Sequence, residues 1–363
     1  MRRVLTADPV VVFAPNWLGD AVMALPAIAD VRRAFPSARL VIAARASVAS
    51  LFQLVPGVDE IVTLTWRGRV LARGARHSDI ATLRTLTVSG QALAILLPNS
   101  FGTAWVARQA RFAERWGYAR DMRGVLLTRS VTVPHDSMHQ GRYYQQLVAG
   151  VGLANGPLEP CVDVSDALRQ AARHQLAAAG WDAQQPLISM APGAAYGTAK
   201  RWLPAHFASV IADLAQRGVR TALVGSAADA GTIRTIVTAS DARAAQPIDL
   251  AGKTSLQELA GVIATSAACL SNDSGAMHLA GAIGTPIVAL FGPTRDAETA
   301  PLTRAGAHSD VLFNPVGCRP CMLRDCPIDH RCMRGLEPSR VTAALAAIVA
   351  GGTDPSDGRR VTA

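Results

Sequence analysis

The sequence predicts an α/β protein made of two doubly wound domains, each built on a parallel sheet. Short apolar runs typical of buried strands alternate with segments of helical periodicity, and this alternation stops near residue 160 and then starts again. The chain has 363 residues, which is long for one hydrophobic core but ordinary for two domains. Half of the residues are hydrophobic and 17% are charged, a composition that excludes a disordered protein.

The first domain is expected to cover residues 1–160. It opens with a strand, a helix and a second strand within about 35 residues, which is the basic crossover unit of a parallel sheet. Expected strands lie at 10–14, 40–44, 60–64, 92–97 and 125–127, and expected helices at 20–35 and 138–152.

The second domain is expected to cover residues 161–335. One of its helices starts with Pro204, whose missing N–H costs nothing there, and another starts with the capping-box sequence Ser255-Leu256-Gln257-Glu258. A last helix, within residues 336–350, could pack on either domain, and the polar residues 351–363 are predicted to be a disordered tail. The expected helices are 204–216, 228–239, 255–266 and 275–283, and the expected strands are 187–191, 220–224, 248–250, 268–271 and 287–291.

Excess positive charge is concentrated in the first domain. The net charge is +9; residues 1–160 hold 18 Arg and 10 Asp or Glu, whereas residues 161–363 hold 18 Lys or Arg and 17 Asp or Glu. Genome composition explains why arginine is preferred to lysine, but it does not explain why the halves differ. We therefore expect the first domain to bind something anionic.

Apolar stretches in this sequence are short. None approaches the roughly 20 apolar residues that span a bilayer, and Asp8 interrupts the one that follows Arg2 and Arg3. We therefore expect a cytoplasmic protein that at most lies against a membrane surface.

Several well-known motifs are incomplete or missing. Gly252-Lys253-Thr254 resembles the end of a Walker A loop, but Pro247 stands where its first glycine is required. No G-x-G-x-x-G opens either domain, which argues against a dinucleotide dehydrogenase, and no G-x-S-x-G supports an α/β-hydrolase. No Asp-x-Asp motif lies between a predicted strand and a helix.

Three loops between predicted strands and helices are rich in glycine and polar residues. In the first, residues 15–20, Asp20 is either a helix N-cap or a carboxylate at the mouth of a sheet. In the second, residues 191–202, small residues leave backbone N–H groups open to a phosphate. Lys200 in this loop is one of only two lysines beside 34 arginines, which indicates that a compact ammonium group is required. An ordinary charged turn is the alternative.

The third loop, residues 271–278, follows an apolar strand and starts a helix. Its N–H groups therefore point toward an anion above the sheet, and Asp273 could orient a hydroxyl. His278 lies one turn further along, where a packed histidine is the commoner role.

Together and in this order, the three loops resemble the lipopolysaccharide heptosyltransferases, which form glycosyltransferase family nine. The resemblance is strongest to the members that add the second heptose, and it covers roughly residues 10–350. It rests on residues 15–20, on Pro192-Gly193 through Lys200-Arg201-Trp202, and on residues 272–278 with Gly292-Pro293-Thr294. It implies the GT-B fold: two Rossmann-like domains facing a central cleft, the first binding the acceptor and the second the nucleotide sugar.

The resemblance implies an inverting transfer of L-glycero-D-manno-heptose from ADP-heptose to the first heptose of heptosyl-Kdo2-lipid A, where Kdo is 3-deoxy-octulosonic acid. The resemblance implies that Asp20 is the general base, that Lys200 holds the departing diphosphate, and that no cofactor is required. It places the remaining donor contacts at Thr198, Asp229, Thr254, Asp273, Ser274, Gly275 and His278.

The basic first domain would then bind the anionic lipid A–Kdo–heptose acceptor at the cytoplasmic face of the inner membrane, with no role for nucleic acid. Arginine recognises phosphates and carboxylates with paired hydrogen bonds. We expect the acceptor-binding region at Arg67, Arg69, Arg73, Arg76 and Arg84.

Four of the six cysteines form the pattern C-x2-C-x4-C-x5-C at Cys318, Cys321, Cys326 and Cys332. This spacing suits a structural zinc or an iron–sulfur cluster, whereas free thiols in a reduced cytoplasm or simple loop packing are the alternatives. The hypothesis is that a structural zinc orders the segment, because Pro315, Pro320 and Pro327 leave no helix or strand to do so.

Three other functions stay open. One is a heptosyltransferase of type I or III, which differs mainly in the acceptor. Another is a nucleotide-sugar epimerase on the same fold, which needs no arginine-rich acceptor region. The last is a non-catalytic nucleotide-sugar-binding protein, which needs no carboxylate at position 20.

Overall fold

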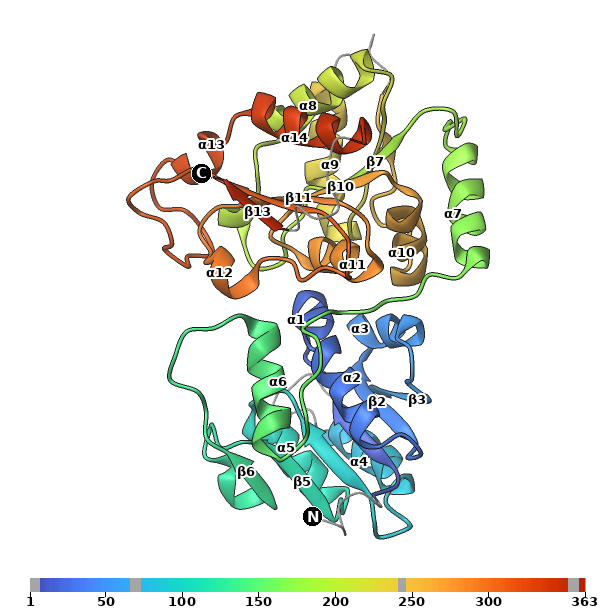
Figure 1. Ribbon diagram of the computed structural model, residues 1–363, viewed down its shortest axis with the longest axis vertical. Helices are drawn as coiled ribbons and strands as arrows, with labels where there is room; N and C mark the ends of the chain where they lie inside the picture. Colours follow the sequence, from blue (N-terminus) through green and yellow to red (C-terminus); the bar gives the residue numbers. More distant parts are fainter. Residues whose placement is uncertain (1–6, 66–72, 241–245, 352–358, 363) are drawn as a thin grey trace. The chain divides into compact units, whose positions relative to one another are not determined.

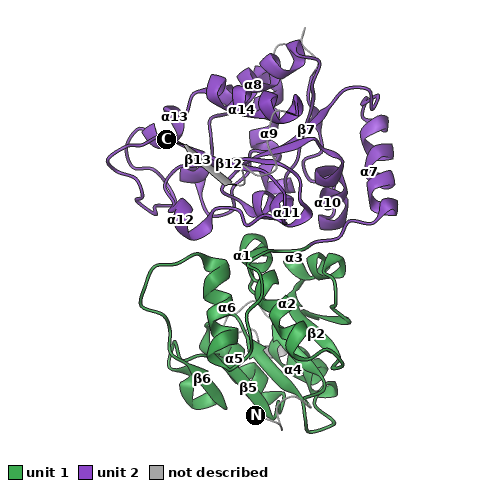
Figure 2. Ribbon diagram, viewed as in Figure 1, with its two compact units in different colours: residues 1–161 green, residues 162–363 purple. Residues whose placement is uncertain are grey.

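The computed structural model describes residues 7–65, 73–240, 246–351 and 359–362. The chain forms two compact units, Met1–Cys161 and Val162–Ala363, close to the domain boundary expected from the sequence (Figures 1 and 2). Each unit contains one parallel sheet with helices on both faces, so the predicted α/β fold class is confirmed. In the described part of the chain, no helix has the length and apolar content needed to cross a membrane.

The sheet of unit 1 has the strand order β3-β2-β1-β4-β5-β6. The order reverses between β1 and β4, and the loops after these two strands therefore flank the crevice where such sheets bind ligands. The strands are β1 Val10–Phe13, β2 Leu40–Arg45, β3 Glu60–Leu64, β4 Leu93–Leu96, β5 Glu114–Tyr118 and β6 Arg129–Val131.

Helices cover both faces of this sheet. On one face, Ile80 and Leu83 of α4 and Val106 of α5 pack against Val11 and Phe13 of β1. On the other face α2 and α6 pack together. The helices of unit 1 are α1 Leu18–Met23, α2 Leu25–Ala34, α3 Ala46–Ala49, α4 Arg73–Thr85, α5 Phe101–Gln109 and α6 Gln140–Gly150, with short 3-10 helices at Ser50–Leu54 and Arg123–Leu126.

Two predictions for unit 1 were wrong. The expected helix 20–35 is broken at Ala24 into α1 and α2, because Pro26 at the start of α2 cannot donate a backbone hydrogen bond to the preceding turn. The expected strand 125–127 falls in the 3-10 helix Arg123–Leu126, where Val125 is 81% exposed.

A fully buried arginine joins β4 to β5 in unit 1. The Arg123 guanidinium is inaccessible to solvent and donates hydrogen bonds to the carbonyl oxygens of Tyr118, at 2.8 Å, and of Pro98. Burial lowers the pKa of Arg123 to about 10, so its charge is retained at neutral pH. Arg123 therefore holds Pro98, near the start of the loop that follows β4, in place.

The sheet of unit 2 has the order β13-β12-β11-β10-β7-β8-β9 and reverses between β10 and β7. Its strands are β7 Leu187–Ala191, β8 Arg220–Leu223, β9 Ile248–Asp249, β10 Ala268–Asn272, β11 Ile287–Phe291, β12 Ser309–Phe313 and β13 Arg359–Thr362. Its helices are α7 Asp166–Ala178, α8 Pro204–Gln216, α9 Ala230–Ala239, α10 Leu256–Thr265, α11 Gly275–Ile283, α12 Asp296–Thr299, α13 Arg331–Arg334 and α14 Pro338–Val349, with 3-10 helices at Thr198–Lys200 and Ala227–Asp229.

The structure answers three questions about unit 2. The capping box between Ser255 and Glu258 is present, as predicted. Helix α14 belongs to this unit, because Val341 and Leu345 share a core with Phe207 of α8. The prediction of a disordered tail at 351–363 was wrong for Arg359–Thr362, which pairs in parallel with β12. Composition did not reveal this pairing, because it depends on the free backbone groups of a neighbouring strand.

Close packing of α11 against the loop before β12 makes Gly281 sensitive to substitution. In Gly281→Ala, the new Cβ would overlap the carbonyl oxygen of Leu302, so we expect the melting temperature to fall by several degrees. Gly231→Ala in α9 is the matched control, because nothing lies within 4 Å of the added carbon. Thermal unfolding of the control should match or exceed that of the parent protein, since alanine favours a helix. Equal melting temperatures of the two variants would contradict the close packing at Gly281.

Candidate functional site

Three loops of unit 2 converge on the carboxylate of Asp273. Lys200, at the end of the loop after β7, donates from Nζ to Asp273 Oδ2 at 2.6 Å. The hydroxyl of Thr294, after β11, donates to the same oxygen at 2.6 Å. The Lys200 and Asp273 side chains are only 12% and 5% exposed. The cluster lies where the strand order reverses, the usual ligand position in such sheets.

Asn272 fixes the path of the loop that carries Lys200. Its Nδ2 donates to the carbonyl oxygen of Pro192 at 2.8 Å, and its Oδ1 accepts from the backbone N–H of Trp202 at 3.2 Å. Both contacts are buried, and they hold the two ends of residues 192–202 against β10. The loop is therefore preorganised by the same β10 turn that supplies Asp273.

Helix α11 begins beside this cluster. The hydroxyl of Ser274 lies 3.0 Å from that of Ser271, and Gly275 is the first residue of the helix. The N-terminus of a helix attracts negative charge through its free N–H groups. His278, one turn further along, is buried.

The remaining donor residues expected from the sequence lie along the same edge. The Asp229 carboxylate accepts hydrogen bonds from the backbone N–H and hydroxyl of Ser226, at 3.0 and 2.7 Å. A Cβ at position 193 would overlap this carboxylate, so any larger residue there would displace the Asp229 side chain. Thr254 follows the outermost strand β9, so it lies further along the edge than the Lys200 cluster.

The cysteine-containing segment packs directly on the loop of Lys200. The expectation that no helix or strand orders this segment was wrong for Cys332, which lies in α13, and hydrogen bonds hold the segment to the loop. Tyr196 Oη donates to the Met322 carbonyl at 2.9 Å, Thr198 Oγ1 to Asp325 at 2.6 Å, and the Ala199 N–H to the Arg324 carbonyl at 2.9 Å.

The four cysteines differ in their surroundings. Cys318 and Cys321 are exposed, Cys326 is half-buried and accepts from the His330 N–H at 3.3 Å, and Cys332 is buried. Burial raises the pKa of the Cys332 thiol. Among the described residues, which include all four, no three His, Cys, Asp or Glu side chains are arranged to hold a metal. The structural zinc stays a prediction.

Asp20 lies in the first turn of α1 in unit 1. The N-cap position belongs to Trp17, so the alternative in which Asp20 serves as N-cap is wrong. Asp20 is half-buried. Burial, followed by the negative charge of Asp20, raises the pKa of Tyr144 on α6 well above its ordinary value. This interaction places the carboxylate near the interface of α1 with α6.

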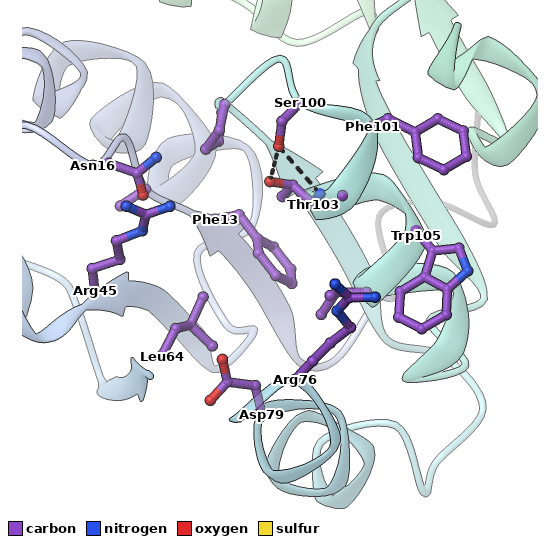
Figure 3. Close-up of a pocket in the computed structure, with 14 residues that line it drawn as sticks. Phe13, Asn16, Arg45, Leu64, Arg76, Asp79, Ser100, Phe101, Thr103 and Trp105 are labelled. Carbon is purple, nitrogen blue, oxygen red and sulfur yellow. Dashed lines mark hydrogen bonds between the residues drawn. The ribbon is translucent and has the colours of Figure 1, made fainter. Parts of the chain in front are cut away.

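A pocket of about 500 Å³ occupies the crevice of unit 1 beside β1 and β4 (Figure 3). Asn16 and Arg45 lie on one side, and Phe101 and Trp105 on the other. The guanidinium of Arg76 stacks 5.2 Å from the centroid of the Trp105 ring. The full lining is Phe13, Ala14, Asn16, Arg45, Leu64, Arg76, Asp79, Pro98, Ser100, Phe101, Gly102, Thr103, Trp105 and Val106.

The structure separates the predicted acceptor arginines. Arg67 and Arg69 lie outside the described residues, and Arg73 starts α4 with its side chain not described. Arg76 lines the pocket, whereas Arg84, at the opposite end of α4, donates to the Gln109 carbonyl at 3.1 Å.

Sequence reasoning missed Arg45 and Trp105. Arg45 is the last residue of β2, and its position at a strand's carboxyl end was a usable signal. Trp105 lies inside α5, where the sequence pattern gave no sign that it would face a pocket.

Two doubly wound units, each with charged loops at the point where its strand order reverses, are the arrangement typical of two-domain nucleotide-sugar glycosyltransferases. The chain belongs to glycosyltransferase family 9 (heptosyltransferase), whose sequence profile matches residues 81–331. The family and the enzyme class predicted from the sequence are thereby confirmed.

Individual relatives agree with this assignment. The chain is 30% identical to lipopolysaccharide heptosyltransferase 2 of Salmonella typhimurium over 81% of its own length and 85% of the relative. It is also 30% identical to lipooligosaccharide heptosyltransferase 2 of Haemophilus ducreyi, over 81% and 86% of the two chains. The structure of E. coli ADP-heptose LPS heptosyltransferase II matches with a TM-score of 0.82 and 27% identity, covering 95% of this chain and 99% of that one.

The ion pair between Lys200 and Asp273 should show strong energetic coupling. Asp273→Asn leaves a largely buried ammonium group without its partner, and we expect the free energy of unfolding to fall by about 3 kcal/mol. Lys200→Met should also destabilise. In urea unfolding, the double variant should lose much less free energy of unfolding than the two single variants lose together. Losses that add exactly would contradict the pairing.

Proposed function

We propose that this protein transfers L-glycero-D-manno-heptose from ADP-heptose to the first heptose of heptosyl-Kdo2-lipid A, with inversion at the transferred carbon. The observation that carries the proposal is the Lys200–Asp273–Thr294 cluster beside the N-terminus of α11. A cation and a helix N-terminus are the groups that stabilise a departing diphosphate. The names of the Salmonella typhimurium and Haemophilus ducreyi relatives, both heptosyltransferase 2, support the choice of sugar and acceptor.

In the proposed reaction, Lys200 holds the diphosphate of the donor. The bond between the heptose C1 and the β-phosphate oxygen breaks, and its electron pair stays on the phosphate. Asp273 keeps the ammonium group of Lys200 in place, while Ser274 and Gly275 present backbone N–H groups. The proposed reaction uses no metal: Lys200 and the backbone N–H groups at the start of α11 contact the leaving diphosphate.

Asp20 is the proposed general base. It removes the proton from the acceptor hydroxyl while that oxygen attacks C1 from the face opposite the diphosphate. The residue lies at the start of α1, directly after the β1 loop at the ligand-binding edge of unit 1. A binding protein would not require a carboxylate there.

The pocket of unit 1 is proposed as part of the acceptor site. Trp105 and Phe101 offer apolar faces to sugar rings, and Arg45 and Arg76 can pair with Kdo carboxylates or phosphates. The acceptor is a lipid, so we further propose that the protein works in peripheral contact with the cytoplasmic face of the inner membrane.

One assay tests this function. The protein is incubated with ADP-heptose and heptosyl-Kdo2-lipid A, and the products are analysed by mass spectrometry. Addition of one heptose is expected, and Kdo2-lipid A without heptose should give no product. Transfer to Kdo2-lipid A alone would instead indicate a type I enzyme, and conversion of the donor without transfer would indicate an epimerase.

Removal of the charge at Asp20 should stop transfer. We expect Asp20→Asn to lower kcat by about 100-fold or more while leaving ADP affinity nearly intact. Asp121→Asn is a suitable control, because Asp121 is exposed and lies outside the pocket. If Asp20→Asn kept more than about a tenth of the turnover, Asp20 would not be the base.

Replacement of Lys200 should affect both binding and chemistry. Lys200→Ala is expected to weaken ADP-heptose binding and to lower kcat, because negative charge grows on the leaving phosphate in the transition state. Lys200→Arg should restore only part of the activity. Steady-state kinetics decide the point: a raised KM with unchanged kcat would argue against a role in leaving-group departure.

A further inference from the structure

We propose that Arg324 is a second diphosphate-binding cation, which acts with Lys200 from the cysteine-containing segment. The inference rests on the proposed nucleotide-diphosphate donor and adds a residue that the loop motifs did not indicate. Its evidence is the position of Arg324, its distance from Lys200 and the distribution of charge around both.

The backbone of Arg324 is fixed against the loop that carries Lys200. Its carbonyl oxygen accepts from the Ala199 N–H at 2.9 Å, and it approaches Gly197 so closely that a Cβ there would overlap it. The next residue, Asp325, accepts from the hydroxyl of Thr198 at 2.6 Å. Arg324 is therefore as firmly placed on this loop as a residue of the loop itself.

The two cations share one aromatic ring. The Nζ of Lys200 lies 5.0 Å from the centroid of the Tyr196 ring, and the guanidinium carbon of Arg324 lies 5.1 Å from it. These distances limit the separation of the two cations to about 10 Å. Two phosphoryl groups in series can be held between flexible cationic side chains at such a spacing. The ring also restrains Arg324 before a ligand arrives, which lowers the entropic cost of binding.

The charge of Lys200 is matched in the protein, whereas that of Arg324 is not. Lys200 is paired with Asp273, and the nearby Asp325 carboxylate accepts a hydrogen bond from the neutral Thr198 hydroxyl and, within the described chain, forms no ion pair with Arg324. In the described part of the chain, no carboxylate forms an ion pair with the exposed Arg324 guanidinium. A guanidinium stacked on a ring keeps its N–H groups free for paired hydrogen bonds to phosphate. Arg324 thus supplies the positive charge that the Lys200–Asp273 pair lacks.

The test compares ADP with AMP, because only ADP has the second phosphate. Binding is measured by isothermal titration calorimetry on the full chain under reducing conditions. We expect Arg324→Gln to raise the Kd for ADP by roughly 10-fold, in line with loss of a charged hydrogen bond, and the Kd for AMP by less than about 2-fold. The Kd of Arg324→Lys for ADP should lie between those of the parent protein and of Arg324→Gln.

Arg217→Gln is the matched control, since it removes the same charge from an exposed residue at the C-terminal end of α8, the opposite end of that helix from the loop. It should leave both Kd values unchanged. The Arg324 contact with Ala199 uses the backbone, so the substituted side chains preserve it, and thermal unfolding verifies that the variants are folded.

Two outcomes would overturn the inference. In one, Arg324→Gln binds ADP as tightly as the parent protein. In the other, affinity for ADP and AMP falls equally, which would mean that Arg324 only supports the loop. If the parent protein binds neither nucleotide, the proposed donor is overturned instead. If Lys200→Ala loses ADP binding while Arg324→Gln keeps it, the donor stands and Arg324 is not part of its site.

Discussion

The proposed nucleotide-sugar site in unit 2 depends on the carboxylate of Asp273. Asp273 accepts hydrogen bonds from Lys200 and Thr294, and in doing so it joins the loops that follow β7, β10 and β11. These loops come from distant parts of the sequence, and each would otherwise be free to move at the edge of the sheet. The neighbouring Asn272 adds buried contacts to both ends of the Lys200 loop. A single turn after β10 therefore organises most of the anion-binding edge.

Much of the fold could be predicted because parallel strands are buried on both faces and appear as continuous apolar runs. Residues 10–13 and 287–291 are examples, and every residue in both is buried. The same rule failed for β5, whose sequence Glu-Arg-Trp-Gly-Tyr contains no such run. It failed again at Val125, where an apolar residue is exposed in a 3-10 helix.

The site was predictable where it depends on short stretches of chain. Lys200 and Asp273 were each recognisable in a strand-to-helix loop, and the structure brings them together with Thr294, which the sequence marked only as part of a family motif. Contacts across the fold were not predictable. Spacing along the chain did not show that Arg84 lies at the far end of α4, or that residues 322–325 pack on the Lys200 loop. Such contacts depend on tertiary packing, which local patterns do not encode.

The contact between Gly193 and Asp229 links two loops that belong to different strands. A larger side chain at position 193 would displace the Asp229 carboxylate, and a residue without a carboxylate at 229 would leave the 3-10 helix after β8 without its cap. The two positions are therefore coupled. A side chain added at position 193 would push the Asp229 carboxylate away from the Ser226 N–H and hydroxyl, so a change in the loop after β7 would uncap a turn in the loop after β8.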